Sequence, residues 1–260
     1  MPNFAKLLKI YLRYKLQSKN PDLLRRFNLL DRVEKDVLKV LATCYEGVSL
    51  SHFHKILKTA NIYDAQGRTL TQRDLERIVF ELNEKQWIRA DNLSTIYCLE
   101  EYERFLVKMT SEDNRFPLFV MAIREILPAK ERSWMRKPRN FQVCIRELQI
   151  AILQKEEEEF VKWLDTITQY YPEQLTATNA LAYLFEDPFD PVLLQSFPTT
   201  FQHTALENII FSGIHQLKST KEYIHYLETH PEIDQSTDLG KRYRALLGNC
   251  LLYTSDAADE

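Results

Sequence analysis

TQRDLERIVFELNEKQWIRADNLSTIYCLE, from Thr71 to Glu100, changes its hydrophobic pattern halfway along. In the first half the apolar residues recur at helical spacing, and they are Leu75, Ile78, Val79 and Leu82. Thr71 stands where an N-cap residue satisfies the first free N–H groups of a helix. The second half holds two short β-prone runs, WIRA and TIYCL, on either side of Asp91 and Asn92. The stretch therefore predicts a helix followed by a β-hairpin.

Two further amphipathic helices are predicted before this stretch. LLDRVEKDVLKVLATCY carries one apolar stripe, formed by Val33, Val37, Val40 and Leu41. After Gly47, Ser49 can cap SLSHFHKILKTANI, whose inward residues are Phe53, Ile56 and Leu57. Three helices followed by a hairpin is the order of a winged helix-turn-helix. We therefore expect a winged helix-turn-helix-like unit over residues 29–100.

The chain from residue 101 to 249 is predicted to be helical throughout. The expected helices are 101–110, 116–127, 140–154, 157–170, 174–185, 189–197, 200–217, 219–229 and 237–248, many of them separated by proline. Helix pairs with short loops favour an α-hairpin, tetratricopeptide-like array, with an irregular bundle as the alternative because no 34-residue repeat recurs. Only five glycines are present, too few to favour a doubly wound α/β fold. The predicted fold class is mainly α.

The N-terminal 28 residues form a separate basic segment. Phe4, Leu7, Leu8, Tyr11 and Leu12 follow helical spacing, and Asn20-Pro21 interrupts the pattern. Residues 1–30 carry seven Lys and Arg and one Asp, against a net charge of -3 for the whole chain. Such an asymmetry indicates either a basic arm for an acidic partner or a solvated helix face that docks on the body.

Motifs for catalysis, nucleotide binding and metal binding are missing from the sequence. The five glycines form neither GxxxxGK[ST] nor GxGxxG, and no HExxH or GxSxG occurs. The four cysteines are far apart, His52 and His54 fall on different faces of one helix, and Glu147 and Glu207 have no spaced acidic partner. KEEEEF, at 155–160, fits the start of a helix. We expect no catalytic, cofactor or metal site within these 260 residues.

No stretch is apolar enough for a signal peptide or a membrane span, so we expect a cytoplasmic protein without a membrane partner.

Two groups of residues are candidates for nucleic-acid binding. Arg73 and Arg77 lie on the helix that a winged helix places in the major groove, although residues 71–86 carry a net charge of -1. The segment AKERSWMRKPRNF holds cations and aromatic residues, and its candidates are Lys130, Arg132, Trp134, Arg136, Lys137 and Arg139. The structural alternatives are a protein-docking or spacer winged helix, and a solvated loop whose Trp packs inward.

Residues 37–91, from VLKVLATC to QWIRAD, resemble the N-terminal region of large bacterial SWI/SNF-type (DEAD/DEAH helicase-like) ATPases. So do YCLEEYERFLVKM, FPLFVMAIREILP and FQVCIRELQIAILQ, and the resemblance fades after about residue 170. In that family a winged-helix-like unit and a helical array precede the ATPase. The resemblance implies that ATP and Mg²⁺ belong to a catalytic part outside this chain, and it assigns no catalytic residue here.

CLLYTSDAADE, Cys250–Glu260, resembles the translation of a transposase-type sequencing adapter. We therefore expect the natural reading frame to continue beyond about Asn249, and the 101–249 array to be truncated.

Three functions are consistent with the sequence. The first is a non-catalytic regulatory or recruitment module of a DNA-dependent SWI/SNF-like ATPase, with DNA, RNA or a protein partner on its helical surfaces. The second is a stand-alone winged-helix transcription regulator with a helical sensor domain. The third is a protein-interaction scaffold with no nucleic-acid role.

Overall fold

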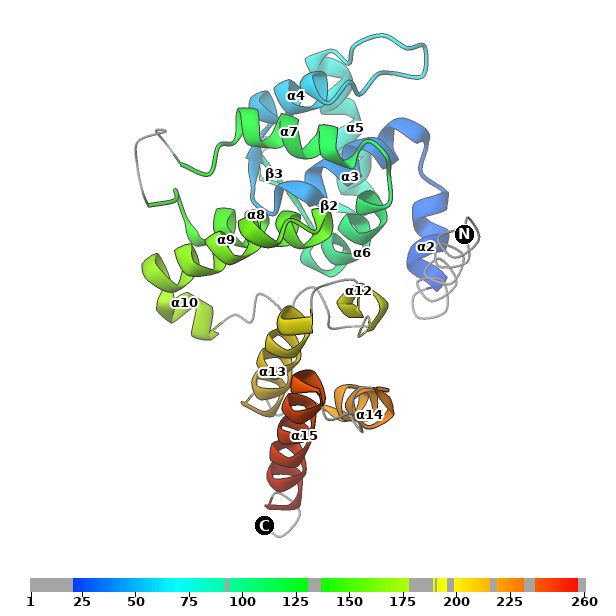
Figure 1. The fold of residues 1–260 in the computed structure, drawn as a ribbon. Coiled ribbons are helices and arrows are strands. Elements are labelled where there is room, and N and C mark those ends of the chain that lie inside the picture. The colour runs from blue at the N-terminus through cyan, green and yellow to red at the C-terminus, as the bar shows by residue number, and fades with distance from the viewer. Residues whose placement is uncertain are drawn as a thin grey trace, which may run out of the picture. The chain divides into compact units, whose positions relative to one another are not determined.

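The computed structural model is mainly helical and describes residues 21–91, 94–130, 137–177, 189, 191–195, 199–215, 219–231 and 237–256 (Figure 1). The chain divides into two compact units, Met1–Tyr170 and Tyr171–Glu260. The division differs from the boundary expected at residues 100 and 101. Helix α6, Glu100–Ser111, packs on α3, Arg32–Cys44, so the helices after the hairpin continue the first unit.

The predicted helices and hairpin of residues 29–100 are present. They are α3, then β1 (Val48–Ser49), α4 (Leu50–Thr59), α5 (Gln72–Glu84), β2 (Ile88–Asp91) and β3 (Thr95–Cys98). The strands form an antiparallel sheet in the order β1-β3-β2, with Val48 opposite Ile96 and Ile88 opposite Cys98. The two-residue strand β1 was not predicted, because a pair this short has no alternating pattern to detect.

Capping groups fix where these helices begin. Asp31 and Glu34 form a capping box at α3, and Thr71 and Asp74 form another at α5. Ser49 caps α4 by accepting a hydrogen bond from the N–H of His52. The apolar stripe of α5 is buried as predicted, with Leu75, Val79 and Leu82 fully enclosed and Ile78 nearly so.

Close packing holds the hairpin against the turn before β1. A Cβ atom added at Gly47 would lie 2.1 Å from Cε1 of Tyr97, so only glycine fits under this ring. The Arg89 guanidinium also packs on this ring, 4.7 Å from its centroid. Tyr97 is thus fixed by contacts with both the turn and the hairpin.

Helix α2, Pro21–Asn28, begins at the proline that interrupts the N-terminal pattern, a favourable first helical position. Arg26 donates hydrogen bonds to the carbonyl of Lys85 at the end of α5 (3.0 Å) and to the hydroxyl of Tyr102 (2.9 Å). Its guanidinium also lies 5.1 Å from the ring of the buried Trp87. One charge of the predicted basic arm therefore anchors α2 to the body, and residues 1–20 lie outside the described residues.

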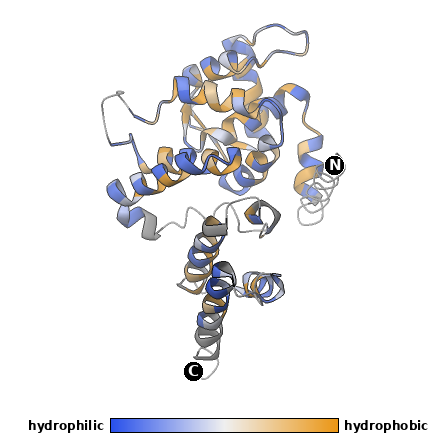
Figure 2. Cartoon of the chain, viewed as in Figure 1, coloured by the Kyte–Doolittle hydropathy of each residue, from blue (hydrophilic) through white to orange (hydrophobic). Residues whose placement is uncertain are grey.

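Four helices complete the first unit: α6, α7 (Phe116–Ile126), α8 (Phe141–Gln154) and α9 (Glu157–Tyr170). Every residue of α8 from Val143 to Ile152 is buried, and α8 and α9 pair as an α-hairpin through a left-handed turn at Lys155. Three glutamates occupy the first turn of α9, as expected for KEEEEF. Figure 2 shows hydrophobic residues gathered in the interior of this unit and a mostly hydrophilic loop between α4 and α5.

The second unit contains α10 (Pro172–Ala177), α12 (Pro191–Gln195), α13 (Thr199–His215), α14 (Lys221–Thr229) and α15 (Asp238–Asp256). Helix α15 packs on α13 and α14, and its buried Tyr243 lies against the ring of His230 at 5.0 Å. The helix was expected to end at residue 248 but continues to Asp256, because neither Gly nor Pro interrupts it after Gly248. The arrangement of these helices as a tetratricopeptide-like array stays a prediction.

An ion-pair network ties α3 to the turn before α7. Arg115 donates to both carboxylate oxygens of Asp36, at 2.9 and 2.6 Å, and to Asp113 at 3.0 Å. Lys39 donates to Asp113 at 2.9 Å. Burial raises the pKa of Asp113, but the hydrogen bonds from Arg115 and Lys39 outweigh it and hold that pKa well below the ordinary value.

Leu75→Ala or Leu82→Ala should lower the free energy of unfolding by about 2–5 kcal/mol, because each truncation leaves a cavity in a fully enclosed site. Urea unfolding followed by tryptophan fluorescence measures this, since all three tryptophans lie in the first unit. Arg73→Ala on the exposed side of the same helix is the control and should change the value by less than about 0.5 kcal/mol. Equal effects from the core and control substitutions would contradict the packing.

Asp113→Asn should destabilise the protein at pH 6, and this effect should shrink progressively as the pH falls from about 4 toward 2. A carboxylate with a lowered folded-state pKa stabilises the fold above its unfolded pKa, ordinarily 3.8. That stabilisation disappears as the pH falls through the lowered value. Unfolding free energies of both proteins across this pH range test it. Glu84→Gln, which removes an exposed carboxylate without an ion pair to any described residue, is the control and should change the unfolding free energy at pH 6 by less than about 0.5 kcal/mol. A difference in unfolding free energy between the two proteins that stays constant across this pH range would contradict the prediction.

Candidate functional site

The outer face of α5 is the strongest candidate for a binding surface. We define it as Arg73, Arg77, Phe80 and Glu84, which lie on the side of the helix away from its buried stripe. The buried stripe orients this face outward, and the Thr71–Asp74 capping box fixes its N-terminal end. Hydrogen bonds from the Thr71 hydroxyl and backbone lower the pKa of Asp74, so the cap stays ionised at neutral pH.

The two predicted DNA-contacting arginines differ in their surroundings. Arg77 donates to Glu81 at 2.8 Å in an exposed i,i+4 ion pair, which contributes no more than about 0.5 kcal/mol. Arg73 has no hydrogen bond or ion pair to any described residue. Phe80, three residues beyond Arg77, is 60% exposed. Arg73 is therefore available to a partner, and the face combines charge with an exposed aromatic ring.

The hairpin beside α5 adds a cation that the sequence did not single out. Arg89 on β2 stacks on Tyr97 and lies 3.6 Å from a carboxylate oxygen of Asp91. The pairing of Arg89 with Tyr97 across the strands could have suggested the stacking. Because Asp91 offsets the charge, the hairpin brings little net positive potential to this face.

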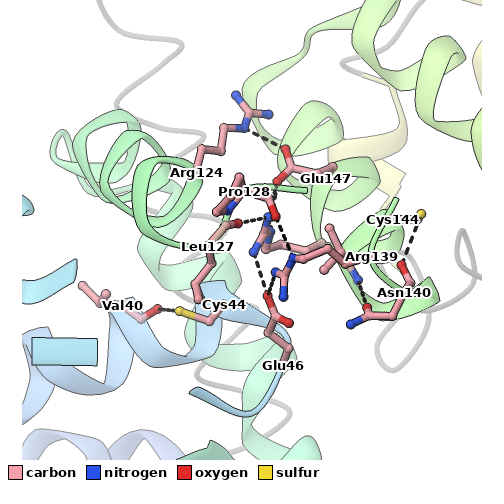
Figure 3. A network of polar contacts seen from close by, with 12 residues as sticks. Val40, Cys44, Glu46, Arg124, Leu127, Pro128, Arg139, Asn140, Cys144 and Glu147 are labelled. Atoms are coloured by element: carbon pink, nitrogen blue, oxygen red, sulfur yellow. Dashed lines mark hydrogen bonds and ion pairs between the residues drawn. The ribbon is translucent and has the colours of Figure 1, made fainter. Parts of the chain in front are cut away.

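One residue of the predicted basic segment, Arg139, makes internal contacts. Arg139 donates to the carbonyl of Pro128 at 2.7 Å and to Glu46 at 2.8 Å (Figure 3). Lys130 is half-buried and Lys137 is exposed. The other three candidates, Arg132, Trp134 and Arg136, lie outside the described residues. The structure brings none of this segment to the outer face of α5 through a described contact.

Arg139 belongs to a buried ion network that the sequence did not reveal. Arg146 on α8 has no solvent exposure and donates to Glu46 (2.9 Å), Glu147 (2.9 Å) and the carbonyl of Leu127 (2.8 Å). Glu147 also accepts from Arg124 at 2.7 Å, as Figure 3 shows. The sequence predicts only that Glu147 lacks a second carboxylate with which to form a catalytic acid pair. Its actual partners are two arginines, which make it a structural ion-pairing group.

The buried cysteines, and the neighbouring residues His52 and His54, show no sign of a reactive or ligand-binding site. Burial raises the pKa of Cys44 and Cys98, and it raises the pKa of Cys144 to about 12, so these three thiols stay protonated at neutral pH. His52 contacts the Ser49 hydroxyl through Nδ1 at 3.0 Å, whereas His54 contacts the carbonyl of Leu70 through Nε2 at 2.7 Å. The two rings therefore have separate partners and do not converge.

Metal-binding clusters and membrane-spanning helices are both missing from the described part of the chain. No group of three or more His, Cys, Asp or Glu among those residues is arranged to hold a metal ion. No helix among the same residues combines the length and apolar character needed to cross a bilayer.

Comparisons of the chain with protein-family models, with curated proteins and with solved structures gave no match. Any functional proposal therefore depends on the sequence pattern, the fold and the surfaces of the described residues.

Glu46→Gln should lower the free energy of unfolding by about 3–5 kcal/mol, because it removes a carboxylate charge that faces the fully buried Arg146. Tryptophan-monitored urea unfolding measures the loss. The matched control is Glu159→Gln, which breaks an exposed pair with Lys162 and should cost less than about 1 kcal/mol. If the two substitutions lower the free energy of unfolding equally, the buried ion network around Arg146 does not stabilise the first unit.

Proposed function

We propose that this chain is a non-catalytic recruitment module of a larger DNA-dependent SWI/SNF-like ATPase, and that residues 29–100 are its winged-helix-type part. The observation that supports this most is the connectivity α3-β1-α4-α5-β2-β3 around an antiparallel sheet ordered β1-β3-β2. This is the order of elements in a winged helix-turn-helix. The sequence resemblance to the N-terminal region of such ATPases extends over the same residues and on to α8.

Protein binding fits the outer face of α5 better than duplex binding does. Phe80 is 60% exposed in the middle of the helix that a winged helix presents to DNA. Acidic Glu81 and Glu84 follow it, and they would face phosphates unfavourably. Exposed aromatic residues and arginines are enriched in protein–protein interfaces. We infer a cytoplasmic protein partner, with ATP and Mg²⁺ bound by a catalytic part of the parent protein.

The proposal predicts that the chain hydrolyses no ATP, with or without DNA. Phosphate release by residues 1–260 in the presence of ATP, Mg²⁺ and duplex DNA tests this. Turnover that is proportional to protein concentration and survives repeated purification would refute the non-catalytic assignment.

The stand-alone regulator stays the second candidate because Arg73 is exposed, without an ion pair to any described residue, at the N-terminal end of α5. A base-reading residue would lie there. Duplex mobility shifts across a salt series separate the two functions. For the recruitment module we expect weak binding that Arg73→Ala with Arg77→Ala leaves unchanged. Tight binding with a steep salt dependence, lost in that double variant, would favour the regulator.

A further inference from the structure

The four residues of the outer face of α5 lie on one narrow strip of the helix. At 3.6 residues per turn, Arg73, Arg77, Phe80 and Glu84 fall within an arc of about 60°. The apolar centre of the strip is the 60%-exposed ring of Phe80. A surface this narrow suits a single partner helix lying along α5.

The charges on this strip are ordered along the helix. Both arginines lie in the N-terminal half, and Glu84 lies in the C-terminal half. Neither Arg73 nor Glu84 has an ion pair with any described residue. They are separated by eleven residues, about 16 Å along the axis, so they cannot reach each other within one helix. A second molecule can therefore supply a partner to each of these two charges.

The strip is complementary to itself in the antiparallel direction. Arg73 and Glu84 lie equally far from the midpoint between Ile78 and Val79. A twofold axis at that midpoint places Arg73 of each copy opposite Glu84 of the other, and this forms two equivalent ion pairs. We propose that α5 is the interface of a homodimer in which two α5 helices pack antiparallel. The proposal names a second copy of this chain as the protein partner of the outer face of α5, and so it rests on the protein-binding role proposed for that face.

The centre and the flanks of the strip fit this arrangement. Phe80 and Arg77 are also equidistant from the midpoint, so each aromatic ring lies at the level of a guanidinium of the other copy, where cation–π contact is favourable. The flanking acids are already engaged, since Glu76 accepts from Gln72 at 3.1 Å and Glu81 from Arg77 at 2.8 Å. One helix face is smaller than the roughly 800 Å² per partner of a stable complex, so we expect a dissociation constant on the order of 10–100 μM.

Charge exchange tests the proposal with the full chain. Sedimentation equilibrium over a wide concentration range should show a monomer–dimer equilibrium for the natural sequence. Arg73→Glu and Glu84→Arg should each weaken self-association by about tenfold or more, because each replaces two attractive pairs with two repulsive ones. A mixture of the two variants should form a heterodimer, and the double variant should recover the homodimer.

An apolar substitution completes the test. Phe80→Ala should abolish dimers, whereas Met121→Ala, which removes another exposed apolar side chain on α7, should leave the equilibrium unchanged. Circular dichroism confirms that the exposed substitutions keep the fold. A chain that stays monomeric at several hundred μM would overturn the proposal, and so would dimers that Phe80→Ala leaves intact. Single charge variants that fail to pair with each other would also overturn it. A duplex-induced or partner-induced dimer without self-association counts against it in the same way.

Discussion

The fully buried guanidinium of Arg146 determines how several helices of the first unit pack together. Arg146 must find acceptors for its N–H groups inside the protein, since an unpaired buried charge costs several kcal/mol. Its acceptors come from three places: Glu46 after α3, Leu127 after α7, and Glu147 on its own helix. The hydrogen bonds of Arg146 therefore hold the ends of α3 and α7 against α8. They also fix the turn that leads into β1. Arg139 and Arg124 bind the same two carboxylates from less buried positions.

Hydrophobic periodicity predicted the elements, because burial on one face of a helix leaves a local trace in the sequence. Leu75 and Leu82 showed where α5 packs, Thr71 showed where it begins, and Asp91-Asn92 marked the hairpin. Contacts between distant residues leave no such trace. Arg146 is separated from Glu46 by 100 residues, so neither its burial nor its partner could be inferred. For the same reason the sequence pattern suggests a boundary at residue 100, before the helices that α3 needs as neighbours.

The candidate binding surface was partly predictable. Arg73 and Arg77 were identified from their place on the third helix, and both lie on its outer side. Phe80 was missed, because a single apolar residue outside a stripe looks like one more core position until its exposure is known. The pairing of Arg139 with Glu46 could not be inferred, because composition counts charges without showing which are already paired with carboxylates. Exposure and pairing together favour another protein chain, rather than phosphates, as the partner of α5.

The position of Glu46 also has a practical consequence for dividing this chain. Ending the chain after the hairpin, at residue 100, would remove Arg139 and Arg146, the ion-pair partners of Glu46. It would also remove α6 and α7, which cover α3. Such a piece would keep every element of a winged helix yet expose a large apolar surface, and it would tend to precipitate. Expression boundaries for the N-terminal half are better placed after α9, near Tyr170, where the chain passes from one compact unit to the next.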